Sequence, residues 1–188
     1  MIAVMISIHP KWVDKIVSGE KTIEVRKSRP KIEPPFKCYI YHTSGGYEWR
    51  DAWCTVVCPP SGKIYDGSQK VIGEFICDRI EEYSYREFGY EISEESFKLT
   101  LLTAEAFVKY GNQRTLYGWH ISNLKIYDKP KPLSCFQTPK AKCEHISIYG
   151  LCLADSQNPP CEEIICNAHR LIRPPQSWQY IEVPDNER

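Results

Sequence analysis

The chain has 188 residues, 24 basic and 24 acidic side chains and 42% hydrophobic residues, which predicts one domain with an elaboration around a single core. Its formal net charge of zero argues against a generally basic nucleic-acid coat protein and against a polyanionic tail protein. Because no apolar run reaches the ~18 residues of a membrane span and the N-terminus does not resemble a secretory signal, we expect a soluble cytoplasmic protein with no membrane partner.

The N-terminal half predicts short strands around one amphipathic helix. His9-Pro10 suits the start of that helix, because the missing N–H of proline costs nothing in a first turn, and Gly19 suits its end. The alternation of apolar and polar residues predicts the strands. We expect strands at 6–8, 22–26, 39–42 and 71–80, with a loop of weak periodicity between the last two.

The second half predicts one helix and several further strands. Ser93 is typical of an N-cap, and the predicted helix runs to about residue 110 with Gly111 at its end. The residues at 116–121 and 124–127 predict a hairpin that turns at Ser122-Asn123, and those at 177–183 a closing strand. The apolar stripe of the helix would be Phe97, Leu101, Ala104 and Val108.

This order of elements is β-α-β-β, then β-α-β-β, then an insertion and a final strand. Short strands that outnumber the helices favour an α+β fold, a small β-barrel with covering helices, over a doubly wound sheet. The residues at 137–173 lose periodicity and gain proline and cysteine, so we interpret them as a Cys/His-rich insertion into a single domain of residues 1–183. The residues at 184–188 would be a flexible tail.

The nine cysteines fall into three groups: Cys38 and Cys77, Cys54 and Cys58, and the five from Cys135 to Cys166. Cys38 and Cys77 lie in strand-like apolar runs and are expected to behave as small buried hydrophobic residues. The insertion holds enough ligands for a structural zinc ion, which needs four in a tetrahedron, but no Cys-x-x-Cys pair selects among them. The alternative is a loop with reduced, partly buried thiols. The candidate ligands, of which four would be used, are Cys143, His145, Cys152, Cys161, Cys166 and His169.

Charge is unevenly distributed along the chain. Residues 9–31 carry seven Lys and Arg against three acids, residues 109–131 carry five against one, and residues 74–95 carry eight acids against two Arg. A neutral total is therefore compatible with one positive face formed by the two basic segments, or with ordinary solvated surface charge.

The most informative motif is Ser18-Gly-Glu-Lys-Thr-Ile-Glu-Val-Arg26. Here a helix ends and a strand begins, and the polar face of that strand carries Glu24 and Arg26, with Lys21 at the junction. Lys and Arg that converge in this way can bind a phosphate or a carbonyl, and Glu24 can hold them in place. The alternative is an ordinary strand with a polar face.

The spacing Gly19-x-Lys21-x-x-Glu24-x-Arg26 resembles the signature of the ASCH superfamily of small PUA-like barrels. Three further stretches resemble the same family in the same order: 6–10 with its helix, the strand at 71–75, and Pro132-Leu133 with 174–178. The likeness leaves out residues of about 44–68 and the insertion. It implies a cleft lined by the Gly-x-Lys motif that binds RNA or a modified nucleotide or nucleoside.

One branch of this superfamily hydrolyses the acyl amide of N4-acetylcytidine with a Lys, a Thr and a Glu. Lys21 and Glu74 match two of these catalytic roles, but Glu24 stands at the position of the nucleophilic Thr. A carboxylate cannot simply replace that hydroxyl, because its attack would give a mixed anhydride. Whether the protein is an enzyme therefore stays open.

Glu74 is also conspicuous in its own strand. It lies between Ile72 and Ile76 on a face that should be buried, so its carboxylate needs a partner or a proton. We expect Lys21 or Arg26 to be that partner. Either Glu74 tunes Lys21 as a base and orients a ligand, or the two form a structural ion pair.

Aromatic and amide side chains suggest a flat ligand at the rim of this cleft. Aromatic rings there could stack on a base, while Trp12 is expected to belong to the core. Gln176 and Ser177 could read a base edge. The expected ligand-binding residues are Lys21, Arg26, Tyr41, Trp119, Gln176, Ser177 and Trp178.

Three functions remain open on the sequence alone. The first is a module that binds RNA or a modified nucleotide through Lys21, Arg26 and aromatic residues. The second is a small amidohydrolase that uses Lys21 and Glu74. The third is an accessory protein whose insertion binds a protein partner. The binding module is favoured because the charged residues of the motif are present while the nucleophile is not.

Overall fold

The computed structural model describes residues 1–44, 55–58, 63–66, 69–139 and 170–183. Helices in these ranges have at most eight residues, and none has the length and apolar character that crossing a membrane requires. The elements are β1 (Ile2–Ile8), α1 (Pro10–Val17), β2 (Ile23–Arg26), β3 (Phe36–His42), β4 (Thr55–Cys58), β5 (Lys63–Asp66), β6 (Lys70–Tyr83), β7 (Tyr85–Arg86), β8 (Gly89–Tyr90), α2 (Glu94–Thr100), α3 (Ala104–Gly111), β9 (Leu116–Pro132), the 3-10 turn η2 (Leu133–Cys135) and β10 (Trp178–Glu182).

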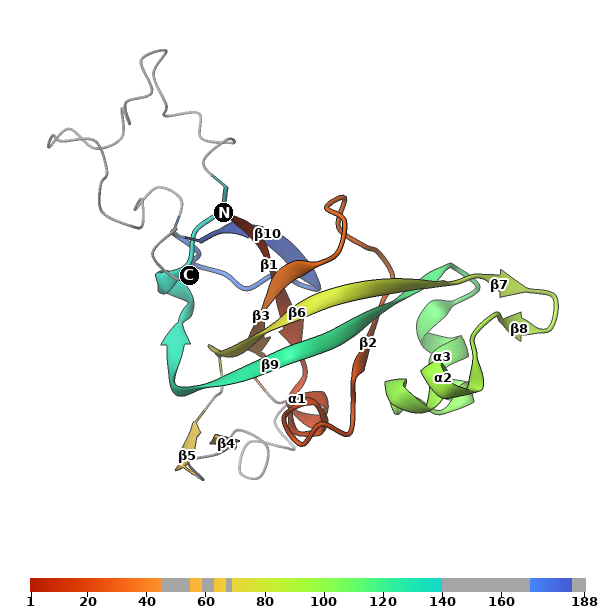
Figure 1. Cartoon of the computed structure of the whole chain (residues 1–188), viewed down its shortest axis with the longest axis horizontal. Coiled ribbons are helices and arrows are strands. Elements are labelled where there is room, and N and C mark those ends of the chain that lie inside the picture. The colour runs from red at the N-terminus through yellow and green to blue at the C-terminus, as the bar shows by residue number, and fades with distance from the viewer. Residues whose placement is uncertain (45–54, 59–62, 67–68, 140–169, 184–188) are drawn as a thin grey trace, which may run out of the picture.

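Six strands form one sheet in the order β10-β1-β3-β6-β9-β2, drawn across the middle of Figure 1. β1 and β3 are parallel, and all other neighbours are antiparallel. The expectation of an α+β fold is confirmed, but the expected barrel is wrong, because β10 and β2 stay at opposite edges of the sheet.

The region of β2 is joined to that of β10 by hydrogen bonds of side chains and of one loop amide, and not by a backbone ladder. The indole N–H of Trp178 donates to Ser28 Oγ at 3.0 Å, and the backbone N–H of Lys31 donates to the Tyr180 hydroxyl at 2.6 Å. The chain after β2 also contains Pro30, Pro34 and Pro35, which have no N–H for a ladder. Isolated hydrogen bonds, and no ladder among the described residues, therefore join these two regions.

Both faces of the sheet are buried under apolar side chains. One core cluster joins α1 to β1, β3, β6 and β9, with Val13 and Ile16 of α1 packed on the sheet. A second cluster lies on the opposite face, where Phe136 and Leu171 cover Met5 and Tyr39. Cys38 and Cys77 are fully buried free thiols, which confirms their interpretation as small hydrophobic residues.

The predicted hairpin at 116–127 is one continuous strand. β9 pairs with β6 along its length, and the pairing shifts register between Ser122 and Lys125. Asn123, the predicted turn residue, has a φ of 47° and sits in this bulge. Asn tolerates the left-handed region in a bulge as readily as in a turn, so the local signal was real but its interpretation was wrong.

β6 also contains irregularities that the simple alternation of residues conceals. Ile72 and Phe75 are three residues apart, yet both belong to the same core cluster. A regular strand would place them on opposite faces, so the register shifts between Val71 and Ile76 reverse the alternation. Glu74 consequently does not share a face with Ile72, contrary to the prediction.

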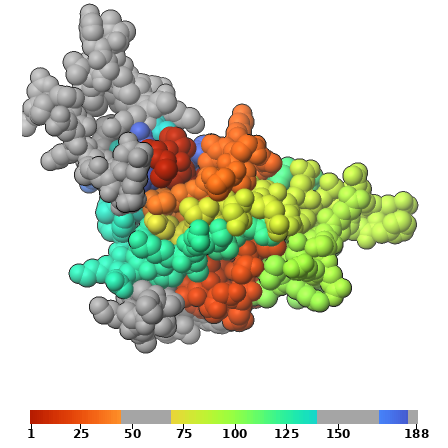
Figure 2. All heavy atoms as spheres, in the orientation of Figure 1, coloured from red at the N-terminus to blue at the C-terminus, as the bar shows by residue number. Residues whose placement is uncertain are grey.

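The predicted helix at 93–110 is two helices. Ser93 caps α2 as expected, but Leu101 ends it with a φ of 56°, and the Thr103 hydroxyl caps α3 by accepting from Ala106 N at 3.2 Å. Leu101 and Val108 of the predicted stripe are therefore exposed, while Phe107 packs against Val25, Tyr83 and Leu116. Together with β7 and β8, the two helices project from one end of the molecule (Figure 2).

The break at Leu101 can be tested with two substitutions of the same kind. Leu101→Gly should cost little stability or raise it, because glycine adopts the left-handed conformation without strain. Leu99→Gly, inside α2, should cost about 1 kcal/mol or more through lost helix propensity and packing. Urea unfolding of both variants measures the difference, and an equal loss in both would indicate one uninterrupted helix.

Candidate functional site

The Gly-x-Lys segment connects α1 directly to β2. Ser18 is the C-cap of α1, and Gly19 follows with a φ of 77°, which glycine adopts without strain. The backbone N–H of Lys21 donates to Lys15 O at 2.8 Å, which turns the chain back over the end of the helix. The sequence therefore places Lys21 at the start of an edge strand, with its side chain 2% exposed.

Lys21, Glu24 and Arg26 form a continuous line of buried charge. The Lys21 Nζ lies 3.4 Å from Glu24 Oε2, and the Arg26 Nη2 lies 2.9 Å from Glu24 Oε1. None of the three side chains is more than 9% exposed. One carboxylate thus serves two cations in a region with little water, so the group carries a net positive charge.

The ammonium group of Lys21 is fully engaged with acceptors. It donates to the backbone carbonyls of Ile23 and Thr100, each at 2.7 Å, in addition to its contact with Glu24. Thr100 is the last residue of α2, and a cation is favourable at the C-terminus of a helix. Burial lowers the pKa of Lys21 below its ordinary value, and the Glu24 carboxylate opposes that shift.

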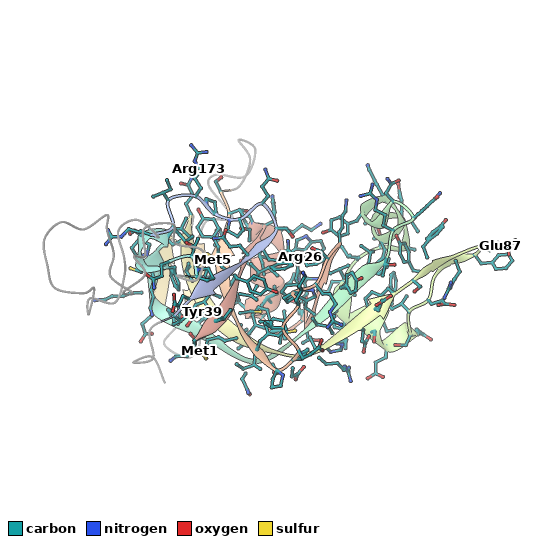
Figure 3. All side chains as sticks on the ribbon, turned by 90° about the horizontal axis from the view of Figure 1, so that it is seen from above. Met1, Met5, Arg26, Tyr39, Glu87 and Arg173 are labelled. Carbon is teal, nitrogen blue, oxygen red and sulfur yellow. The ribbon has the colours of Figure 1, made fainter. Side chains whose placement is uncertain are left out.

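Arg26 connects β2 to the neighbouring segments. Its Nη2 donates to the Ser7 carbonyl at 2.6 Å, and its Nη1 donates to Ser177 Oγ at 3.4 Å. Its Nε–H is buried and has no hydrogen-bond partner among the described residues. The Arg26 side chain, labelled in Figure 3, is buried, at 8% exposed.

These charges line a cavity of about 320 Å³. It lies where β1, β2, the loop before β10 and the α2–α3 region meet, and its size is within the range of small-molecule sites. Lys21, Glu24 and Arg26 are the charged residues of its lining, and Trp12 and Tyr110 contribute aromatic rings. The remaining lining residues are Ser7, His9, Val25, Thr43, Leu102 and Gln176.

Cations lie against both aromatic rings. Lys21 Nζ lies 5.1 Å and Lys11 Nζ 4.9 Å from the centre of the Trp12 ring, and Lys27 Nζ lies 4.8 Å from that of Tyr110. Burial raises the pKa of the Tyr110 hydroxyl, while Arg26 opposes the shift and Glu24 adds to it. Tyr110 therefore stays a neutral hydrogen-bonding group at physiological pH.

The structure brings some of the predicted site residues to this cavity and leaves others elsewhere. Gln176 lines it together with the three charged residues, and Ser177 contacts Arg26. Trp12, expected in the core, both packs against the core and lines the cavity. The expected ligand contacts Tyr41, Trp119 and Trp178 belong to packed clusters and are not among the lining residues.

Several lining residues were not anticipated from the sequence. Leu102 and Tyr110 reach the cavity because the chain breaks between α2 and α3, which no periodicity signals. His9 was recognised as the start of the helix, where its ring accepts from Lys11 N at 3.4 Å, but not as a cavity residue.

The predicted partnership of Glu74 with Lys21 or Arg26 is wrong. Glu74 Oε1 lies 3.2 Å from Lys37 Nζ, and Glu74 Oε2 accepts from the Tyr127 hydroxyl at 2.6 Å. The bulges in β6 turn its side chain away from the cavity, whose lining does not include it. Partial burial opposes ionisation of Glu74, but the bonds from Tyr127 and Lys37 outweigh it and lower its carboxyl pKa.

The candidate zinc ligands lie outside the described residues. All six fall within residues 140–169, so a structural zinc ion in the insertion stays a prediction. In the part of the chain that the structure describes, no three His, Cys, Asp or Glu side chains come together as a metal site. Cys135, just before the insertion, is an exposed free thiol.

The fold and the cavity define the class of protein: a mixed α+β domain with an open sheet and a charged cavity, open to solvent, beside an edge strand. A family model, the ASCH domain, matches residues 6–107, which is more than half of the chain. The chain belongs to the ASCH domain family, as the resemblance of its motifs predicted. No curated protein matches the chain.

Solved structures show the same fold. The crystal structure of ASCH from Zymomonas mobilis is similar with a TM-score of 0.54 and 17% identity, over 98% of this chain and 90% of that chain. A serine-to-alanine variant of the Zymomonas mobilis protein gives a TM-score of 0.54 and 16% identity, over 96% of this chain and 88% of that chain. At this level of identity the likeness concerns the fold alone.

Because Glu24 lies between Lys21 and Arg26, we expect a substitution that removes its negative charge to destabilise the fold strongly. Glu24→Gln leaves two buried cations without a counter-charge, which should cost about 3 kcal/mol or more of unfolding free energy. Glu20→Gln removes the exposed pair with Lys15 and should change little. Urea unfolding compares them, and equal effects would show that the line of charge is unimportant for stability.

The low pKa of Glu74 predicts a pH-dependent contribution to stability. Its carboxylate stabilises the fold above its ordinary pKa of 4.5, and this stabilisation is lost as pH falls through the lower pKa of the folded state. Glu74→Gln should therefore be less stable than the parent by about 1 kcal/mol at pH 7. The difference should shrink below about pH 4.5, as measured by unfolding across pH, and a constant difference would contradict it.

Proposed function

We propose that the protein binds RNA or a modified nucleotide in the cavity lined by Lys21, Glu24 and Arg26. The observation that carries this proposal is a net positive, buried polar floor that lies in the same cavity as two aromatic rings, those of Trp12 and Tyr110. A nucleotide offers the complementary parts, a flat base with polar edges and an anionic phosphate.

The guanidinium group of Arg26 supports a ligand with a hydrogen-bond acceptor. Arg26 lines the cavity, and a guanidinium group binds oxygen acceptors through charge-assisted hydrogen bonds. The guanidinium group is already fixed by Ser7 and Glu24, so little conformational freedom is lost on binding. Base carbonyls and phosphate oxygens are both suitable acceptors.

The aromatic rings support recognition of a base by stacking. A base stacked on an aromatic side chain gains about 1–3 kcal/mol, and both Trp12 and Tyr110 line the cavity. The Gln176 amide can donate to and accept from a base edge. Lys11 and Lys27, beside the two rings, are suited to contact the adjoining backbone phosphates. The association of ASCH domains with RNA binding supports the same function.

Deacylation of an N4-acetylcytidine-like nucleoside is the second candidate. The lowered pKa of Lys21 favours it, and the Thr43 hydroxyl in the cavity offers a nucleophile in place of the missing one. Two observations place it behind binding. The ammonium of Lys21 is held by three acceptors, and Glu74, the expected third catalytic residue, contacts Lys37 instead.

Two cavity variants and one aromatic control test the binding function. Tyr110→Leu should weaken binding of a single-stranded RNA or of a ribonucleoside 5′-monophosphate about tenfold through lost stacking. Arg26→Lys keeps the charge but removes the planar guanidinium group, and should weaken binding of the same probes. Tyr85→Leu, in the projecting β7–β8 hairpin, should bind as the parent does. Fluorescence titration measures the affinities.

The same titrations include the outcomes that would overturn the proposal. Equal affinity in the parent, Tyr110→Leu and Arg26→Lys would remove the cavity as the binding site. Rapid release of acetate from N4-acetylcytidine by the parent, lost in Lys21→Ala, would establish the hydrolase instead.

A further inference from the structure

The end of the molecule formed by β7, β8, α2 and α3 carries an apolar groove of about 390 Å³. It is separate from the charged cavity, with which it shares no lining residue. The two helices and the hairpin that form it project from the sheet (Figure 1). We propose that this groove is a docking site for a basic amphipathic segment of a protein partner. Its lining includes Phe88, Tyr90, Ile92, Phe97, Phe107 and Val108.

Phe88 is the residue that the fold itself does not explain. It is 97% exposed, so it contributes nothing to a core. It forms the two-residue loop of the hairpin with Glu87, since Tyr85 pairs with Tyr90 and Arg86 with Gly89. Such loops favour Asn, Asp and Gly, and the residue of this hairpin with a positive φ is Gly89, directly after the loop. An aromatic residue that neither the turn nor the core requires is typical of a binding surface.

The support beneath Phe88 is well packed. The Tyr90 ring lies 5.0 Å from Phe107 and 5.1 Å from Tyr85, centre to centre. The Tyr90 hydroxyl donates to Arg114 O at 2.9 Å, which holds the hairpin against the chain after α3. Figure 3 shows Glu87, next to Phe88, at the far tip of the molecule. The apolar side chain is therefore displayed on a fixed support, which lowers the entropic cost of binding.

The charges on the segments that form the groove select the occupant. Glu87, Glu95 and Glu105 are each next in sequence to a lining residue; they are exposed, and in the described part of the chain they form no salt bridge. Glu94, which lines the groove, is paired with Lys98, and Glu91 with Arg86. An acidic rim repels the phosphates of RNA. It also disfavours a twofold contact between two copies of this chain, because such a contact would bring the two acidic rims together.

A basic amphipathic peptide satisfies both properties of this surface. Its apolar side chains would bury Phe88 and Val108, and its Lys and Arg side chains would meet the acidic rim. This site does not depend on the proposed nucleotide cavity, so each function can fail without the other.

The test uses the full chain and a fluorescent helical peptide of Leu and Lys, with a matched peptide of Leu and Glu. The Leu/Lys peptide should bind, more weakly as salt rises, and Phe88→Ser should reduce its affinity about tenfold. Ile172→Ser removes another exposed apolar side chain, 84% exposed and outside the groove, and should have no effect. The double variant Glu87→Lys, Glu95→Lys should also weaken binding.

Four outcomes would overturn the proposal. Equal affinity of Phe88→Ser and Ile172→Ser would show that the groove is not the site, and equal binding of the Leu/Glu peptide would remove the role of charge. Weaker binding of single-stranded RNA in Phe88→Ser would make RNA the occupant. A concentration-dependent dimer in sedimentation equilibrium, lost in Phe88→Ser, would make a second copy the occupant.

Discussion

The buried contact of Glu24 with Lys21 and Arg26 is the interaction on which the site and part of the fold depend. A carboxylate with two cations in a nearly dry interior is tolerated only because further acceptors satisfy the remaining protons. Ile23 and Thr100 accept from Lys21, and Ser7 accepts from Arg26. The same bonds attach the edge strand β2 to α2 on one side and to β1 on the other.

The open sheet and the cavity have a common origin. A closed barrel would use the backbone of β2 for a second ladder and would fill the space beside it. Among the described strands β2 pairs with β9 alone, and the side chain of Arg26 spans the distance to Ser7 and to Ser177 before β10. Because a side chain is thinner than a strand, space remains around it, and the residues that stabilise the edge also line the cavity.

A substitution of Lys21, Glu24 or Arg26 therefore affects stability and binding together. Tyr110 lines the cavity without belonging to this line of charge, so its substitution tests binding more directly than that of Glu24 does.

The sequence predicted most reliably the features that depend on local chemistry. The N-caps at His9 and Ser93, the end of α1 at Gly19 and the grouping of Lys21, Glu24 and Arg26 follow from residue type and short spacing. The errors concern backbone irregularities set by tertiary pairing. Asn123 fits a turn or a bulge equally well, and only the length of β6 decides for the bulge.

The bulges of β6 place Glu74, a residue of the predicted site, away from the cavity. The alternation that put Glu74 on the face of Ile72 fails because β6 is bulged, and the predicted contact with Lys21 fails with it. The break at Leu101 had the opposite effect and brought an unanticipated pair, Leu102 and Tyr110, to the cavity. Irregular backbone of this kind is common next to functional sites, where it redirects side chains.

The neutral total charge of the chain hides two regions of opposite character. The cavity holds two cations for one carboxylate, with Lys11 and Lys27 beside it, while the segments that form the groove carry exposed glutamates at 87, 95 and 105. At physiological salt, exposed charges are screened beyond about 8 Å, so each region acts on the ligand directly in front of it. A chain with this division can attract an anionic ligand to one region and repel it from the other. If both proposals hold, the acidic end keeps its groove free of nucleic acid, and the domain can bind RNA and a basic protein segment at the same time.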